Sequence, residues 1–333
     1  MRRFEVRSVA ASLALLGALL ALVGVGVGST GLESVWRMLD DNSAMQIVWD
    51  IRLPRTLGAW SAGALLGLAG AIAQGLFRNP LADPFLLGSA SGAALGVALT
   101  LVLLGISPVA AALLMRVGLT GGAFVGAVFG VLLTLLLAQG VQHTLRLLLA
   151  GVVVGVVLGA LRELVLITRP EVLQSMQAFM LGSTAYVGWE SCLLMLCVWF
   201  VCMLAAWQFA PVLDGLSLGE ATAASLGLPL KQLRTALVAI LALATGTCVA
   251  HTGLIAFVGL AAPHLVRAFV KTSHGWHILL SSLMGAAVLQ VADLLARSLV
   301  APQELPVGIL SAILGGCYLL WLMYRRLGGH QSL

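Results

Sequence analysis

Apolar residues run along almost the whole chain in blocks of about 20, and short polar segments separate each block from the next. Blocks of this length match the roughly 20 residues that a helix needs to cross the hydrocarbon core of a bilayer. The pattern therefore predicts an all-α membrane protein with about ten transmembrane helices, in a single domain that covers residues 1–333. The predicted helices span approximately 9–28, 54–76, 86–105, 117–138, 145–167, 191–208, 233–250, 253–270, 276–296 and 306–324.

The amino-acid composition excludes a water-soluble fold. Hydrophobic residues make up 60% of the chain and charged residues only 9%, whereas soluble domains are about one quarter charged. The basic start of the chain and the apolar block after it would also fit a cleavable signal peptide. Because many further apolar blocks follow, we expect the first helix to be retained.

The 18 basic and 13 acidic residues indicate orientation rather than a nucleic-acid partner. The arginines lie singly at the ends of apolar blocks, whereas a nucleic-acid site would cluster them on one face. With the N-terminus in the cytoplasm, the cytoplasmic ends hold more Lys and Arg than the outer loops, as the positive-inside rule requires. An even number of spans then places both termini in the cytoplasm.

Glycines recur at four-residue intervals in several of the apolar blocks. In lipid, helices associate through close backbone approach and van der Waals contact, which small residues permit. We therefore expect these glycines to mark tightly packed helix pairs. They are Gly63 and Gly67; Gly92 and Gly96; Gly118, Gly122, Gly126 and Gly130; and Gly151, Gly155 and Gly159.

Motifs of the common catalytic and metal-binding sites are missing from the sequence. The GxxxxGK[ST] loop of ATP-hydrolysing proteins is absent, and so are HExxH, GxSxG and CxxC or Cys/His ligand spacings. The five cysteines lie inside apolar blocks, which favours a role as small core residues. We expect no catalytic residue, no metal site and no cofactor bound by this chain. His251 could offer an imidazole to haem iron, but a lone histidine gives this little support.

Three longer polar segments, 29–53, 168–190 and 208–232, are expected to fold outside the bilayer. The third is cytoplasmic in this orientation. Its sequence is rich in alanine, with Glu220 early and Pro229 at its end, which is typical of one or two short helices. A short helix presented to the cytoplasm offers a contact surface for a soluble partner.

Several short motifs lie in order over nearly the whole chain. They are Arg52–Leu57 with Gly70, Gln74 and Arg78–Pro84; Leu148–Gly151; Leu218–Glu220 with Leu226–Leu228; Phe257–Leu260 with Pro263–Arg267; Ala292–Asp293 with Ala296–Arg297; and Glu304–Gly308. Each motif alone is weak. At this joint spacing the chain resembles the FecCD-type permeases, which carry iron-siderophores, haem and cobalamin.

The resemblance implies a type II ABC importer permease fold in the bacterial inner membrane. It implies a homodimer around a central pathway, two cytoplasmic ATPase subunits that bind ATP and Mg, and a periplasmic binding protein. The substrate class is a metal chelate, with haem or a ferric siderophore favoured over cobalamin. The family's ATPase-coupling segment falls on Leu218, Gly219, Glu220, Ala223, Leu226 and Gly227.

Arg52, Arg55 and Arg297 are cationic on the side where the charge rule disfavours cations, and they match family positions that dock the binding protein. Arginine suits docking because its planar guanidinium can hold a carboxylate with two hydrogen bonds. The alternative is that these side chains reach phospholipid headgroups. Asp293, four residues before Arg297, is expected to pair with it along a helix.

Arg162 and Glu163 lie within the fifth apolar block, where a charge is a functional candidate. Neighbours in sequence point about 100° apart on a helix, so we expect each to need its own partner. The resemblance implies that this helix lines the pathway, where Arg162 could attract an acidic chelate. The alternative is an interhelical ion pair or contact with the membrane surface.

Two rival interpretations stay open at this point. An ion-coupled secondary transporter would need no ATPase, and it predicts a self-contained polar site or broken helices at mid-membrane. A purely structural membrane scaffold is the other. The few ionisable residues inside the apolar blocks argue against the transporter, and the outer arginines together with the cytoplasmic segment argue against the scaffold.

Overall fold

The computed structural model describes residues 5–28, 31–32, 42–104, 112–138, 144–225 and 230–328. All ten predicted blocks form helices. Within the described ranges, seven helices are long and apolar enough to cross a membrane, and three further apolar helices are shorter. The ten are α1 Val6–Gly26, α4 Leu53–Phe77, α5 Ser89–Leu104, α6 Ala112–Leu137, α7 Thr144–Thr168, α9 Trp189–Ser217, α11 Leu230–Thr252, α12 Val258–Phe269, α13 His274–Ser298 and α14 Val307–Gly328.

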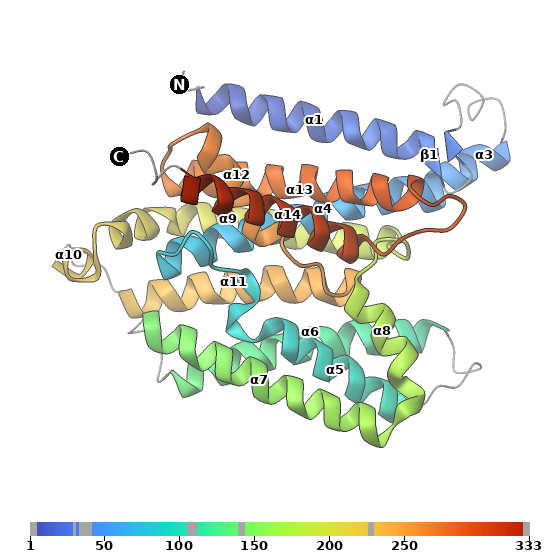
Figure 1. Ribbon diagram of the computed structural model, residues 1–333, viewed down its shortest axis with the longest axis horizontal. Coiled ribbons are helices and arrows are strands. Elements are labelled where there is room, and N and C mark those ends of the chain that lie inside the picture. Colours follow the sequence, from blue (N-terminus) through green and yellow to red (C-terminus); the bar gives the residue numbers. More distant parts are fainter. Residues whose placement is uncertain are drawn as a thin grey trace.

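Short elements gather at the two ends of this bundle. The start of α1 and the end of α14 lie at the same end as α10, which we call the α10 end (Figure 1). Strands β1 and β2, which pair antiparallel, lie with α3 at the opposite end, which we call the α3 end. The short elements are β1 Val27–Gly28, β2 Gly31–Leu32, α3 Asn42–Ile47, η1 Val48–Arg52, η2 Pro84–Leu87, η3 Pro170–Val172, α8 Leu173–Leu181 and α10 Glu220–Ser225.

Helix α4 is the centre of the core, and nearly all of its residues are buried. It packs against α9, α11, α12 and, most extensively, α13. A Cβ atom added to Gly63 would lie 2.3 Å from the carbonyl oxygen of Gly285, and one added to Gly67 would lie 2.1 Å from that of Ser281. The two backbones therefore touch, which is how helices associate where burial from water gives no drive.

The same kind of contact joins α5 to α6. A Cβ atom on Gly92 would lie 2.1 Å from the carbonyl oxygen of Gly126, and one on Gly96 the same distance from that of Gly122. These two ridges confirm the tight packing that their spacing predicts. The fourth predicted ridge, on α7, is correct only in part. Gly151 meets the carbonyl oxygen of Leu86, whereas Gly159 has nothing within 4 Å of an added Cβ.

A loop from each end of the bundle dips inward beside α4. After α4 the chain turns through Arg78, whose φ is 49°, and the Asp83 carboxylate accepts a hydrogen bond from the Phe85 amide at 2.8 Å to start η2. From the α3 end, residues 253–257 lead to α12 through Phe257, whose φ is 68°.

Helix α4, the start of η2 and the first turn of α12 meet at three small or rigid residues. A Cβ atom on Gly70 would lie 1.7 Å from the carbonyl oxygen of Gly259, and one on Gly259 would lie 2.5 Å from Pro84 Cγ. Helix α12 has 12 residues, so it extends about 18 Å, which is less than the hydrocarbon core of about 30 Å. The apolar pattern at 253–270 therefore contains a loop and a half-length helix rather than one full span.

Candidate functional site

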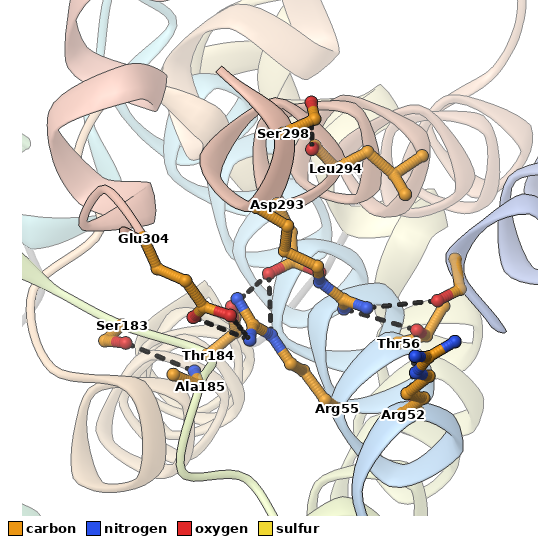
Figure 2. A network of polar contacts seen from close by, with 12 residues as sticks. Arg52, Arg55, Thr56, Ser183, Thr184, Ala185, Asp293, Leu294, Ser298 and Glu304 are labelled. Carbon is orange, nitrogen blue, oxygen red and sulfur yellow. Dashed lines mark hydrogen bonds and ion pairs between the residues drawn. The ribbon is translucent and has the colours of Figure 1, made fainter. Parts of the chain in front are cut away.

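A buried group of charged side chains lies at the α3 end, where α4, α13 and two loops converge. Figure 2 shows Arg55 from the first turn of α4 and Asp293 from α13 pointing toward one another. Arg297, one turn later on α13, belongs to the same group. Thr184 comes from the loop before α9, and Glu304 from the loop before α14. We call these five residues the Asp293 network.

Asp293 is the central acceptor of this network, and its side chain is 1% exposed. Its Oδ1 accepts from Arg55 Nε at 3.2 Å and from the Thr184 hydroxyl at 2.6 Å, and its Oδ2 accepts from Arg297 Nη2. A buried carboxylate is stable only when opposite charges and hydrogen bonds replace its hydration. Here both oxygens have such partners, from segments far apart in the sequence.

Two of the arginines at this end, Arg297 and Arg52, also fasten α1 to the bundle. Arg297 Nη1 donates to the carbonyl oxygen of Gly24 at 3.1 Å, and its Nη2 donates to the Thr56 hydroxyl at 3.2 Å. Arg52 Nη1 donates to the carbonyl oxygen of Val25 at 3.2 Å. The last turn of α1 is therefore held by hydrogen bonds as well as by apolar contact.

The structure brings together the three arginines that the sequence singled out for docking. Arg52 and Arg55 are each 7% exposed in the chain and Arg297 is 2% exposed. Their side chains point into the protein, so contact with phospholipid headgroups does not explain their position. The predicted pair of Asp293 with Arg297 is confirmed. Docking itself stays a prediction.

Two members of the Asp293 network were missed as partners by the sequence reasoning. Thr184 had no signal, because a single threonine in a polar loop is unremarkable. Glu304 stood in a motif of the family, and its position just before Pro306 and α14 could have marked it. Neither could be matched to its partner without the fold, because 109 residues separate Thr184 from Asp293 and 249 residues separate Glu304 from Arg55.

Arg162 and Glu163 on α7 differ from the expectation in one respect. Arg162 Nη2 donates to the Glu163 carboxylate, and Arg162 Nη1 lies 3.5 Å from Met180 Sδ on α8. The expectation that each needs a separate partner was wrong, because the long arginine side chain reaches back along the helix surface to its neighbour. The Arg162 side chain is 20% exposed and that of Glu163 is 54% exposed. A role in the pathway stays a prediction.

The predicted coupling segment contains a short helix that projects from the α10 end (Figure 1). Helix α9 ends at Ser217, Leu218 is 66% exposed, and Gly219 has a φ of 111°. Helix α10 then runs from Glu220 to Ser225 and buries Ala223. Leu226 and Gly227 lie outside the described residues. The expected short helix is present, whereas its contact with a partner is a prediction.

The base of this projecting segment is tied to α13. Asp214, on the last turn of α9, accepts from the His274 amide at 3.0 Å and lies 2.6 Å from His274 Nδ1 at the start of α13. Nearby, Arg267 on α12 donates to the Gln74 side chain on α4, whose own amide donates to the carbonyl oxygen of Leu260 at 3.1 Å. The turn of α9 from which α10 projects is therefore fixed to α13, and α12 is fixed to α4.

The described residues contain no group of three or more His, Cys, Asp or Glu side chains that could hold a metal ion. His251 lines a cavity of about 490 Å³ between α6, α9 and α11, together with Glu190 and otherwise mostly apolar residues. Three of the five cysteines are buried as expected, whereas Cys197 and Cys317 are exposed on helix surfaces. All five are free thiols.

These features define a class of protein. A bundle of apolar helices, interrupted by two loops that dip into it, with a buried charge network at one end and a projecting helix at the other, is the architecture of a polytopic membrane transport protein. Residues 13–325 match the FecCD transport family, and the chain belongs to that family.

Known proteins resemble this chain over nearly its whole length. It is 38% identical over 330 residues to the hemin transport system permease protein HmuU of Yersinia pestis, which covers 97% of each chain. It is 35% identical over 318 residues to the vitamin B12 import system permease protein BtuC of Pectobacterium atrosepticum, covering 95% of this chain and 94% of that one. A metal-chelate type ABC transporter in an inward-facing conformation has a chain that superposes with a TM-score of 0.84 at 30% identity, covering 96% of this chain and 99% of that chain.

Proposed function

We propose that this chain is the permease subunit of an ABC importer for a metal chelate, with haem or a ferric siderophore as the favoured substrate over cobalamin. The observation that carries the proposal is the 38% identity to a hemin permease over 97% of both chains. The solved chain of a metal-chelate type transporter supports the same class, because it is 30% identical and the match covers 99% of that chain. The chain itself is not an enzyme in this proposal.

The proposed complex contains a second copy of this chain, two cytoplasmic ATPase subunits that bind ATP and Mg, and a periplasmic binding protein. It lies in the bacterial inner membrane with both termini in the cytoplasm. The α10 end would then be the cytoplasmic end, which fits the position of α10 at the same end of the bundle as the start of α1 and the end of α14 (Figure 1). The Asp293 network would lie at the periplasmic end.

Each candidate residue has a place in this arrangement. The segment from Leu218 to Gly227 seats an ATPase, because α10 projects there and its base is fastened to α13. Arg52, Arg55 and Arg297 form a cationic base on which the binding protein docks. Arg162 and Glu163 lie on the exposed side of α7 and face the route of the substrate.

An ion-coupled secondary transporter is the second candidate, because α5 and α12 are short and two loops dip into the bundle, as the rival interpretation expected of broken helices. Against it stands the chemistry of the meeting point. Gly70, Pro84 and Gly259 carry no ionisable side chain, and the carboxylate of the neighbouring Asp83 is engaged by the Phe85 amide. Close packing there is a sufficient reason for the interruption.

The test is to purify the cognate binding protein, identify its bound ligand by mass spectrometry, and measure uptake by the complete complex in proteoliposomes. We expect haem or a ferric siderophore, and uptake that requires ATP inside the vesicles. Bound cobalamin would correct the substrate and keep the class. A bound sugar or amino acid would contradict the chelate class, and uptake driven by an ion gradient without ATP would support the secondary transporter.

A further inference from the structure

Two carboxylates share the guanidinium of Arg55. Asp293 Oδ1 accepts from Arg55 Nε at 3.2 Å, while both oxygens of Glu304 accept from Arg55 Nη1, at 2.9 and 2.8 Å. Figure 2 shows the two acids approaching the guanidinium from different elements, α13 and the loop before α14. One arginine thus joins the core of the bundle to a loop at its surface.

The two acids are held to very different degrees. Asp293 is 1% exposed and also binds Arg297 and Thr184, so it cannot leave without stranding a second arginine. The Glu304 side chain is 28% exposed, on a loop that reaches the surface at Pro302 and Gln303. Of the two carboxylates, Glu304 is therefore the one that can be exchanged.

We propose that Glu304 occupies Arg55 in the undocked permease, and that an acidic side chain of the docking protein takes its place. This inference rests on the proposed function, because it presupposes a binding protein at the α3 end. The exchange replaces one carboxylate by another, so Arg55 keeps a compensating charge throughout. A buried arginine that lost one partner without gaining another would be strongly destabilised.

The exchange would also carry the docking event to α14. Glu304 is followed by Leu305, whose amide donates to the carbonyl oxygen of Ala296 at 3.0 Å, and α14 begins at Val307. The amide of Gly308 donates to the carbonyl oxygen of Gly182 at 3.3 Å. Release of Glu304 removes the charged anchor of this loop while the two backbone contacts remain, so the first turn of α14 gains freedom without unfolding.

The test compares Glu304→Gln with Glu171→Gln in the full complex with its ATPase, reconstituted in nanodiscs. Both variants remove one negative charge, and Glu171 is 52% exposed and pairs with Arg169 rather than with the Asp293 network. We expect Glu304→Gln to tighten binding of the cognate binding protein by about two- to fivefold, the range that a partly exposed ion pair contributes. Glu171→Gln should bind like the wild type, which separates a specific exchange from general charge.

Weaker docking of Glu304→Gln, or docking equal to that of Glu171→Gln, would overturn the proposal. Glu304→Asp keeps the charge but is one methylene shorter, so it should tighten docking by a smaller factor. If both Glu304 variants fail to yield folded complex, Glu304 is a fixed structural residue and the exchange is wrong. A wild-type complex that binds no binding protein at all would instead contradict the proposed function.

Discussion

The charge of Asp293 is what allows Arg55 and Arg297 to lie buried at one point. Each arginine donates to a different oxygen of this carboxylate, and Thr184 donates to it as well. A carboxamide at this position could still accept hydrogen bonds, but it would leave two positive charges opposed by Glu304 alone within the network. The charge balance of the Asp293 network therefore depends mainly on this one carboxylate.

Asp293→Asn is expected to lower the free energy of unfolding by roughly 3–5 kcal/mol, because it leaves buried arginines without their shared counter-charge. The measurement is reversible unfolding of the purified chain in detergent. Asp50→Asn is the matched control, since Asp50 is an exposed residue at the same end, and it should change stability by less than about 0.5 kcal/mol. Equal effects of the two substitutions would show that Asp293 is not the centre of the network.

Sequence reasoning at this scale succeeds where partners are close along the chain. The pair of Asp293 with Arg297 follows from a four-residue interval on a helix. The contact of Arg55 with Asp293 spans 238 residues, and no local pattern encodes it. The inward orientation of all three arginines also escaped prediction, because an apolar block that ends in arginine looks the same whether the side chain turns to lipid or to protein.

Among the helices, α4 and α13 form the most extensive contact, and glycine makes this approach possible. The backbone contact at Gly67 leaves no room for a side chain, whereas Gly121 on α6 has nothing within 4 Å of an added Cβ. Glycine is therefore required by the packing at Gly67 and is not required by it at Gly121. Only the packing partner distinguishes them.

Gly67→Ala is expected to destabilise the chain by about 1–3 kcal/mol, the usual cost of inserting a methyl group into a filled interface. The added atom would lie 2.1 Å from the Ser281 carbonyl oxygen, so α13 must move away. Unfolding in detergent measures the effect. Gly121→Ala should stay within about 0.5 kcal/mol of the wild type, and a similar loss in both variants would mean that the α4–α13 contact is looser than described.

The connection from α9 to α10 depends on Gly219, whose φ of 111° is one that residues with a side chain rarely adopt. Gly219→Val should redirect α10 and abolish co-purification of the ATPase while the bundle stays folded. Gly188→Val, at the opposite end of α9 with φ −92° and open space around it, is the control and should co-purify normally. Normal assembly of the Gly219 variant would refute the role of α10 in coupling.

The helices themselves were predictable, and their internal boundaries were not. Each apolar block contains a helix, because composition and length suffice to identify a span. The block at 253–270 looked like a complete span, yet its first five residues form a loop. Apolar residues fit both states equally well in a buried setting, so hydropathy could not tell a loop packed against α4 from a turn of helix.

On the scale of the whole molecule, α7 lies on an exposed face, and Arg162 is near the end of α7 that points toward the α3 end (Figure 1). In the proposed importer this charge attracts an acidic chelate. Arg162→Ala should leave assembly with the ATPase unchanged and slow uptake in proteoliposomes by about tenfold, the lower end of the range for electrostatic steering. Arg169→Ala removes the same charge from a side chain that is 60% exposed at the end of α7 and should transport normally. Failure of Arg162→Ala to insert would instead assign it a structural role.

The inward-dipping loop at 253–257 packs against the segment around Gly182, and the first turn of α14 completes that segment. The amide of Leu254 donates to the carbonyl oxygen of Phe179 at 3.1 Å, and that of Ser183 donates to Thr252 at 2.7 Å. The adjoining carbonyl of Gly182 receives its hydrogen bond from Gly308, in the first turn of α14. Backbone groups inside a bilayer have no water to bind. The carbonyl group of Gly182 therefore has this partner only once α14 has packed, so the docking of α14 is the step that completes this end of the fold.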